Sequence, residues 1–277
     1  MIFVTSQKLL HSVFGNEVVA VEGESTLFDK IRLELASSED WLISQIVGDA
    51  TANSMEEGST IFNMCVSIVS CDALRRAIPA LDLVLTPNGF GIVQNSNVVP
   101  ASKERVERLI HSCVVRRDHA IERLYPMLAR HDSWQNSEQR KFWARSPLQS
   151  FALVDVWNKG KDFESRYDAL IAMRNEASPF VMKLSERYIS SAVMGRISLA
   201  MCSMGDSDSE KNDRELCSHV ANIVVRHLNG NIFKHQLVDP IVNFLRENDD
   251  DWRNSEVAEL YDAATFKNKK DSKGYFF

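Results

Sequence analysis

The chain lacks the features that mark several protein classes. Its 277 residues include only five cysteines, an odd number, and no two of them form a Cys-x-x-Cys pair. This argues against a disulfide framework and a zinc site, and is typical of reduced core thiols in a cytosolic protein. Glycine and proline are scarce, at 11 and 7 residues, which excludes fibrous and disordered classes.

Long hydrophobic runs are also absent. None approaches the roughly 20 residues that a bilayer-spanning helix needs, so we expect no membrane partner. The opening sequence MIFVTSQKLLHSVFGNEVV lacks a basic region, an apolar core and a cleavage site in that order, so we expect no signal peptide. The remaining composition, 44% hydrophobic and 25% charged, suits one compact helical body or two helical lobes.

Charge is unevenly distributed along the chain, whose net charge is −6. Residues 100–146 carry ten Lys and Arg against six Asp and Glu, whereas residues 201–262 carry six against thirteen. Solvated helix faces would account for this pattern. Alternatively, basic and acidic zones meet across subunits, because complementary fields steer and register an assembly.

Apolar residues recur at helical spacing before and after one short interruption. The stretch from Ser25 to Val47 fits one long helix or two short ones. Ser59 is placed to cap a second helix, and Ser102 to cap a third that runs to about Ala129. Pro147 suits the first position of a further helix, and an acidic loop precedes a helix that Asp208 or Ser209 would cap.

The interruption predicts a β-hairpin over Asp82 to Val93. Two short β-favouring runs flank a turn in which proline presets φ and Asn-Gly accepts positive φ values. An isolated hairpin is marginal in water, so it must lean on helices or pair with strands from elsewhere, including another chain. The residues assigned to this interaction hairpin are Thr86, Pro87, Asn88, Gly89, Phe90 and Gly91.

These patterns predict a mainly α fold: a helical bundle body with one inserted β-hairpin and an extended C-terminal tail. The predicted organisation is an N-terminal helical lobe over residues 1–146, with the hairpin at 82–93, a C-terminal helical lobe over 147–262, and a tail over 263–277. No internal repeat with a period of 20 to 50 residues is evident, although the two lobes are of similar size.

The candidate catalytic groups have ordinary structural explanations. Arg116-Arg117-Asp118-His119 with His111 is the densest cluster, but no nucleophile or second ligand accompanies it at a useful spacing. Polar helix residues beside a core stripe explain it better. His131-Asp132 lies in a predicted loop without a nucleophile motif nearby.

Metal and nucleotide signals are equally weak. Cys217, His219 and His227 lack a second anchor pair, and the lone Gly89-Phe90-Gly91 lacks the third glycine and the following helix of a dinucleotide fingerprint. Acidic residues interrupt the basic segment from Lys103 to Arg145, which argues against specific nucleic-acid binding. We therefore predict no catalytic residue, metal site or cofactor.

The last twelve residues, FKNKKDSKGYFF, combine four lysines with four aromatic residues. Aromatic side chains bury roughly 150 to 250 Å² each, enough to dock a segment in a pocket, and lysines address an acidic neighbour. Whether the tail docks on its own chain or on another is left open. The residues assigned to this interaction tail are Phe266, Lys267, Lys269, Lys270, Tyr275, Phe276 and Phe277.

Four segments carry a resemblance to a known family: FDKIRLELASSEDWL, LRRAIPALDLVLTPNGFGIVQNSNVVPASKERVERLI, WQNSEQRKFW and AELYDAATFKNKKDSKGYFF. The chain resembles an uncharacterised family of proteins from gut Bacteroidetes and their phages or prophages, often found among phage structural genes. In architecture it is loosely similar to head-to-tail connector proteins of tailed phages, which form rings.

The resemblance implies a non-enzymatic virion structural protein, a head-to-tail connector, adaptor or head-completion protein that assembles as a homo-oligomeric ring. Its partners would be further copies of itself and neighbouring portal or tail components, and it would be assembled in the bacterial cytoplasm and located in the virion. The alternatives are an interaction or assembly factor that is not retained in the virion, and an enzyme of unrecognised type.

Overall fold

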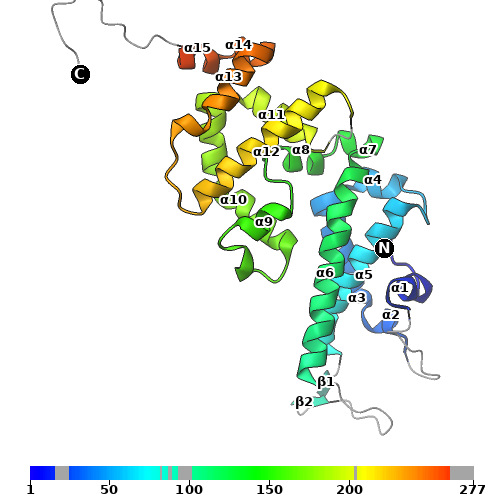
Figure 1. The fold of residues 1–277 in the computed structure, drawn as a ribbon. Helices are drawn as coiled ribbons and strands as arrows, with labels where there is room; N and C mark the ends of the chain where they lie inside the picture. Colours follow the sequence, from blue (N-terminus) through cyan, green and yellow to red (C-terminus); the bar gives the residue numbers. More distant parts are fainter. Residues whose placement is uncertain (16–24, 82, 87–88, 93–101, 203–204, 263–277) are drawn as a thin grey trace, which may run out of the picture. The chain divides into compact units, whose positions relative to one another are not determined.

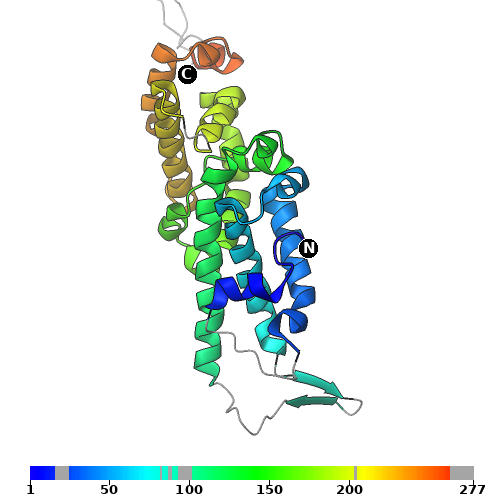
Figure 2. The same ribbon diagram turned by 90° about the vertical axis from the view of Figure 1, so that its right-hand side faces the viewer.

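The structure is a computed structural model that describes residues 1–15, 25–81, 83–86, 89–92, 102–202 and 205–262. Over these residues the chain is built almost entirely of helices (Figures 1 and 2). They fall into two compact units. Unit 1 comprises Met1–Ala144, Gln149–Met173 and Cys202–Met204, and unit 2 comprises Arg145–Leu148, Arg174–Met201 and Gly205–Phe277.

Unit 1 is centred on α5, which packs most extensively against α6 and then against α3. Ser59 caps α5 as predicted, because its hydroxyl accepts a hydrogen bond from the Phe62 amide at 3.3 Å. The helical elements of this unit are α1 (Gln7–Phe14), α2 (Leu27–Lys30), α3 (Arg32–Leu42), the π-helix η2 (Ile43–Val47), α4 (Asp49–Ser54), α5 (Thr60–Ala77), the 3-10 helix η3 (Ile78–Ala80), α6 (Lys103–Leu128), α7 (Asp132–Gln135), α8 (Glu138–Ala144), α9 (Ala152–Val156), the 3-10 helix η4 (Gly160–Asp162) and the first turns of α10 (Arg166–Leu184).

Unit 2 is built around α12, which packs against α11. The helix cap lies one residue earlier than predicted: Ser207, rather than Asp208 or Ser209, accepts a hydrogen bond from the Glu210 amide. The helical elements here are the remainder of α10, the π-helix η5 (Ser185–Ile189), α11 (Ser191–Ala200), α12 (Asp208–Leu228), the 3-10 helix η6 (His235–Leu237), α13 (Asp239–Asn248), α14 (Asp250–Arg253) and α15 (Glu256–Asp262).

The predicted mainly α class is confirmed. The prediction that an inserted β-hairpin helps to define the fold class is wrong. The only β structure in the described residues is one ladder between β1 (Leu83–Thr86) and β2 (Gly89–Ile92), four residues each, which joins no other strand. A two-stranded ladder this short is marginal by itself, so the helices determine the fold. Pro87, Asn88 and the predicted tail over 263–277 lie outside the described residues.

The chain divides differently from the predicted lobes. Gln149–Met173 belongs to unit 1, because Asp118 of α6 accepts hydrogen bonds from the backbone amides at the start of α10. Pro147 does not begin a helix. Its carbonyl instead accepts a hydrogen bond from the Cys217 thiol, and the Leu148 carbonyl accepts one from Arg174 at 3.0 Å.

The two units share one local construction. In each, a helix ends in a five-residue π-helix followed by a residue with positive φ: Gly48 after η2, with φ 82° and ψ 147°, and Ser190 after η5, with φ 73° and ψ 149°. The amide of each donates to the carbonyl five residues earlier, at 2.7 Å for Gly48 and 2.9 Å for Ser190. Ser190 is the one non-glycine residue with positive φ in the described part of the chain.

A buried tryptophan fixes each π-helix. The indole nitrogen of Trp134 donates to the Ile46 carbonyl at 2.9 Å, and that of Trp252 donates to the Tyr188 carbonyl at 2.8 Å. Each acceptor lies two residues before the positive-φ residue. The tryptophans occur in matching sequences, DSWQNSE over 132–138 and DDWRNSE over 250–256. The two units are therefore built on the same Asp-x-Trp-x-Asn-Ser-Glu motif.

We expect Ser190→Gly to stabilise the protein by about 1 kcal/mol, because positive φ with extended ψ strains a residue that has a side chain. Losing the Ser190 hydroxyl, which accepts a hydrogen bond from the Val193 amide, should cost only a few tenths of a kcal/mol. Chemical denaturation measures the difference. The control Ser191→Gly, at the first position of α11, should destabilise by about 0.5 kcal/mol; a Ser190→Gly variant no more stable than wild type would show that Ser190 is unstrained.

Candidate functional site

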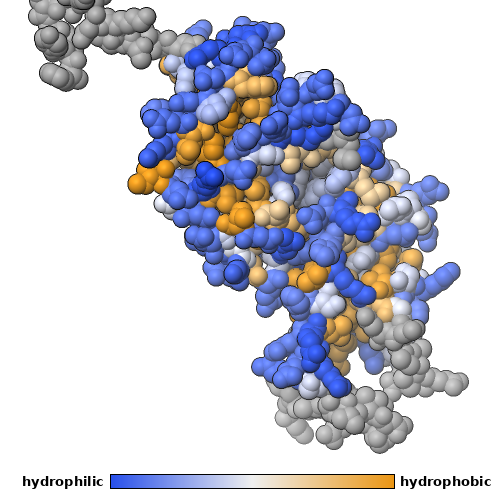
Figure 3. All heavy atoms as spheres, in the orientation of Figure 1, coloured by the Kyte–Doolittle hydropathy of each residue, from blue (hydrophilic) through white to orange (hydrophobic). Residues whose placement is uncertain are grey.

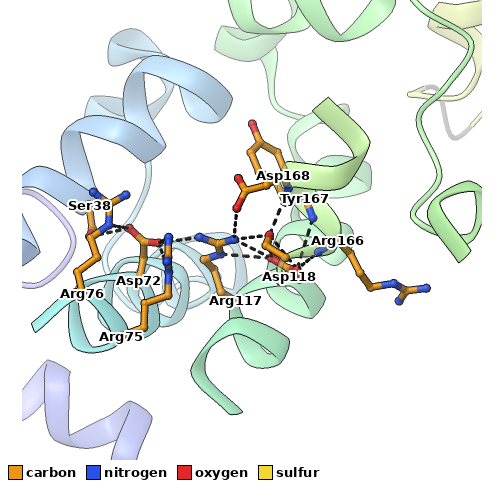
Figure 4. A network of polar contacts seen from close by, with 10 residues as sticks. Ser38, Asp72, Arg75, Arg76, Arg117, Asp118, Arg166, Tyr167 and Asp168 are labelled. Carbon is orange, nitrogen blue, oxygen red and sulfur yellow. Dashed lines mark hydrogen bonds and ion pairs between the residues drawn. The ribbon is translucent and has the colours of Figure 1, made fainter. Parts of the chain in front are cut away.

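A buried arginine holds the helices of unit 1 together (Figure 4). The Arg117 side chain, on α6, is only 1% exposed and donates to Asp72 of α5 at 2.7 Å. Its guanidinium lies 5.6 Å from the centroid of the Trp41 ring on α3. Asp72 is fully buried and also accepts a hydrogen bond from Ser38 of α3 at 2.8 Å. The cluster thereby connects α3, α5 and α6.

Asp118 extends this cluster to the start of α10. Its carboxylate accepts a hydrogen bond from the Arg166 amide at 2.6 Å and another from the Ser165 hydroxyl. Arg117 donates to Ser165 as well, and forms an ion pair with Asp168 at 3.5 Å. A carboxylate at a helix N-terminus is stabilising, because it satisfies free amides and opposes the helix dipole.

The ionisation states follow from these contacts. Burial alone would raise the pKa of Asp72, but Arg75 and Arg117 outweigh burial and hold that pKa below its usual value. Burial would lower the pKa of Arg117, but Asp118 and Asp72 outweigh it and raise that pKa. Stabilisation by Asp72 is therefore present above the ordinary carboxyl pKa and lost as the pH falls through the lowered one.

Arg117 and Asp118 belong to the densest group of candidate catalytic residues in the sequence, but the cluster does not arrange them for catalysis. Arg117 and Asp118 are buried and bonded to each other and to neighbouring helices, so no substrate can contact them. His111 and His119 are exposed on the same helix. Asp72, Ser38 and Ser165 were not among the residues predicted from the sequence. Only Asp72 gave a signal, as an acidic residue within the apolar run of α5.

The other candidate ligands are not brought together. Cys217 is buried, the His219 side chain is 62% exposed beside Glu215, and His227 stacks on Phe180 with ring centroids 3.9 Å apart. His131 precedes α7 as its N-cap residue. Among the residues that the structure describes, no three His, Cys, Asp or Glu side chains form a group that could hold a metal ion, and no bilayer-spanning helix is found.

Unit 2 carries an open apolar groove between α12 and α13, with a volume of about 620 Å³. Figure 3 shows hydrophobic side chains gathered over these helices and the loop between them. On that loop, Leu237 is 39% exposed and Ile232 is 84% exposed. The apolar lining residues are Leu216, Ile223, Leu237, Pro240, Ile241 and Phe244, and the polar ones are Asn212, Glu215, His219, Asn222 and Arg226.

The shared motif allows the helices that form this groove to be compared with their counterparts in unit 1. In chain order, the two helices before the tryptophan motif are α5 and α6 in unit 1, and α12 and α13 in unit 2. In unit 1 this pair forms the most extensive helix contact in the described residues, whereas α12 packs chiefly against α11. The α12–α13 pair therefore packs together less closely than its counterpart in unit 1, and the groove lies along it.

Negative charge gathers around Arg196 in unit 2. Arg196 of α11 forms ion pairs with Asp213 at 3.1 Å and Asp251 at 3.0 Å, and a further pair with Asp249. The hydrogen bond to Asp249 is the main cause of a raised Arg196 pKa. One guanidinium faces three carboxylates, so the cluster keeps excess negative charge.

The residues predicted to form the interaction hairpin and the interaction tail lie partly or wholly outside the described residues. Thr86 ends β1, while Gly89, Phe90 and Gly91 belong to β2, as backbone positions whose side chains are not described. Pro87, Asn88 and every residue assigned to the interaction tail, from Phe266 to Phe277, lie outside the described residues. Their interaction roles stay predictions.

Comparison with known proteins gives one family match. Residues 17–142 match the family described as "Family of unknown function (DUF6712)". The match covers less than half of the chain and includes Asp72 and Arg117, whereas the groove of unit 2 lies beyond it. Neither the curated proteins nor the solved structures contain a match. The expected likeness to an uncharacterised family is confirmed at this level, and the phage context stays a prediction.

We expect Arg117→Met to destabilise the protein by about 3 kcal/mol, because the buried Asp118 carboxylate loses the guanidinium beside it, whereas Asp72 keeps its pairs with Arg75 and Arg76. Chemical denaturation of full-length protein measures the loss. The matched control is Arg108→Met on the same helix, where Arg108 forms an exposed pair with Glu104; it should cost less than about 1 kcal/mol. Equal losses for the two variants would contradict a structural role for the buried cluster.

Proposed function

We propose that this protein is a non-enzymatic phage virion structural protein that acts by self-association, as a head-to-tail connector, adaptor or head-completion protein in a homo-oligomeric ring. The observation that carries the proposal is the open groove between α12 and α13. Leu237 in the groove and Ile232 on the preceding loop expose apolar side chains, and exposed apolar area is stabilised when a partner covers it.

The charge distribution supports the same proposal. Residues 205–262 carry thirteen Asp and Glu against six Lys and Arg, whereas residues 100–146 and the last twelve residues are basic. Complementary fields of this kind raise the association rate and fix the register between subunits. The charged groups of the cluster around Arg117 connect helices within unit 1, and Asp72, Arg117 and Asp118 at its centre are buried.

The phage setting rests on the resemblance of the four quoted segments to proteins found among phage structural genes. The expected partners are further copies of the chain and neighbouring portal or tail components, within the virion. An assembly factor that leaves the particle is the alternative, and the two differ in one observable. A structural protein is retained in purified virions in stoichiometric amounts, whereas an assembly factor is not.

We expect Phe244→Asp to abolish self-association, because a charge in the apolar groove opposes burial of that surface. Light scattering over a range of protein concentrations measures the mass of the wild type and the variant. Leu237→Asp, at a more exposed lining position, should act in the same direction. The control Met182→Asp changes a residue that is 58% exposed on α10 and does not line the groove, so the assembly should persist.

A circular dichroism spectrum and melting curve establish that each variant is folded. If Phe244→Asp and Leu237→Asp fold and still associate as the wild type does, the groove is not the association surface. If the wild type is a monomer at every concentration and is missing from purified particles, the proposed function is wrong.

A further inference from the structure

We propose that the groove of unit 2 binds the C-terminal segment, residues 263–277, of a neighbouring copy of the chain. This inference rests on the proposed function and names the contact through which the copies associate. Each copy would offer one groove and contribute one segment. Such a heterologous contact builds a ring when the rotation between copies closes.

The last described helix, α15, ends close to the groove, so the segment that follows it starts there. Tyr261, one residue before the end of α15, donates from its hydroxyl to Asp239 at 2.9 Å. Asp239 is the first residue of α13, and its neighbours Leu237 and Pro240 line the groove. Arg246 of α13 holds the same tyrosine from its ring face, 5.7 Å from the ring centroid. The segment therefore begins next to a groove end.

The length of the segment allows it to reach a neighbouring copy. An extended chain from Asp262 to Tyr275 spans about 45 Å. The groove face of α12, from Asn212 to Arg226, is about 21 Å long, at a rise of 1.5 Å per residue. When the segment is extended, its three terminal aromatic residues reach beyond the groove of their own chain and can enter that of the next copy.

The chemistry of the two surfaces is complementary. The segment contributes Phe266 and Tyr275-Phe276-Phe277, and aromatic side chains of this size are typical anchors in apolar pockets. The groove supplies six apolar lining residues in a volume of about 620 Å³, within the roughly 300 to 1,000 Å³ of small-ligand sites. Between these anchors, four lysines and one aspartate give the segment a net positive charge, which suits the acidic composition of residues 205–262.

Two variants, each defective in one half of the contact, test the inference. The first replaces Tyr275, Phe276 and Phe277 by Ser and keeps the groove, and the second is Phe244→Asp, which keeps the segment. Alone, each should be a monomer. Mixed, they should form a complex of one copy of each, because the groove of the first accepts the segment of the second. Light scattering measures the mass, and Tyr275→Phe is the matched control that should associate as the wild type does.

The results separate the inference from the proposed function. If wild type associates and the Tyr275-Phe276-Phe277 variant does so equally, or the mixed variants form no complex, the inference is wrong while self-association stands. A cysteine pair then identifies the chain that supplies the segment: Ser272→Cys with Asn222→Cys should form a disulfide between two chains, since the five native cysteines are buried. A disulfide formed only within one chain would overturn the inference in favour of docking on the same copy.

Discussion

The buried guanidinium of Arg117 is the constraint on which unit 1 depends. A charge this deeply buried is tolerated only when it is paired, and its partners lie on different elements: Asp72 on α5, and Ser165 and Asp168 around the start of α10. Asp118 compensates part of the charge from the same helix, and the remaining partners require α5 and the start of α10 to be in place. The cluster therefore favours one arrangement of α3, α5, α6 and the first turn of α10 over other apolar packings.

The tryptophan motif supplies a second constraint, once in each unit. A π-helix leaves its carbonyls poorly placed for regular helix bonds, and the buried indole of Trp134 or Trp252 satisfies one of them. The motif also fixes the helix that follows, because Ser137 and Ser255 each accept a hydrogen bond from an amide three residues later. The units share this frame and differ in what surrounds it, which leaves the α12–α13 face open.

Helix positions were largely readable from the sequence, because they depend on local spacing: the helix capped by Ser59 and the long helix after Ser102 lie where the patterns place them. The caps were less readable, since the Ser102 side chain forms no capping hydrogen bond and Ser207 caps α12. The prediction gave the hairpin too large a part in the fold class, because turn-forming residues predict a reversal of the chain and not a sheet. Long-range pairing was not readable. Nothing near Arg117 in sequence indicates Asp72 or Ser165 as partners, and the groove depends on how far two helices separate. The recurring Asp-x-Trp-x-Asn-Ser-Glu was a readable signal that was overlooked, because its copies lie 118 residues apart.

The central claim is that unit 1 uses its charges internally as a scaffold, whereas unit 2 presents the surface through which the protein associates. Hydrogen exchange of the full chain, compared between dilute and associated protein, tests this most directly. The account predicts slower exchange over residues 212–226 and 237–244 on association, and unchanged exchange in α5 and α6 around Asp72 and Arg117. Protection that appears in α5 and α6, with none in residues 212–226, would contradict it.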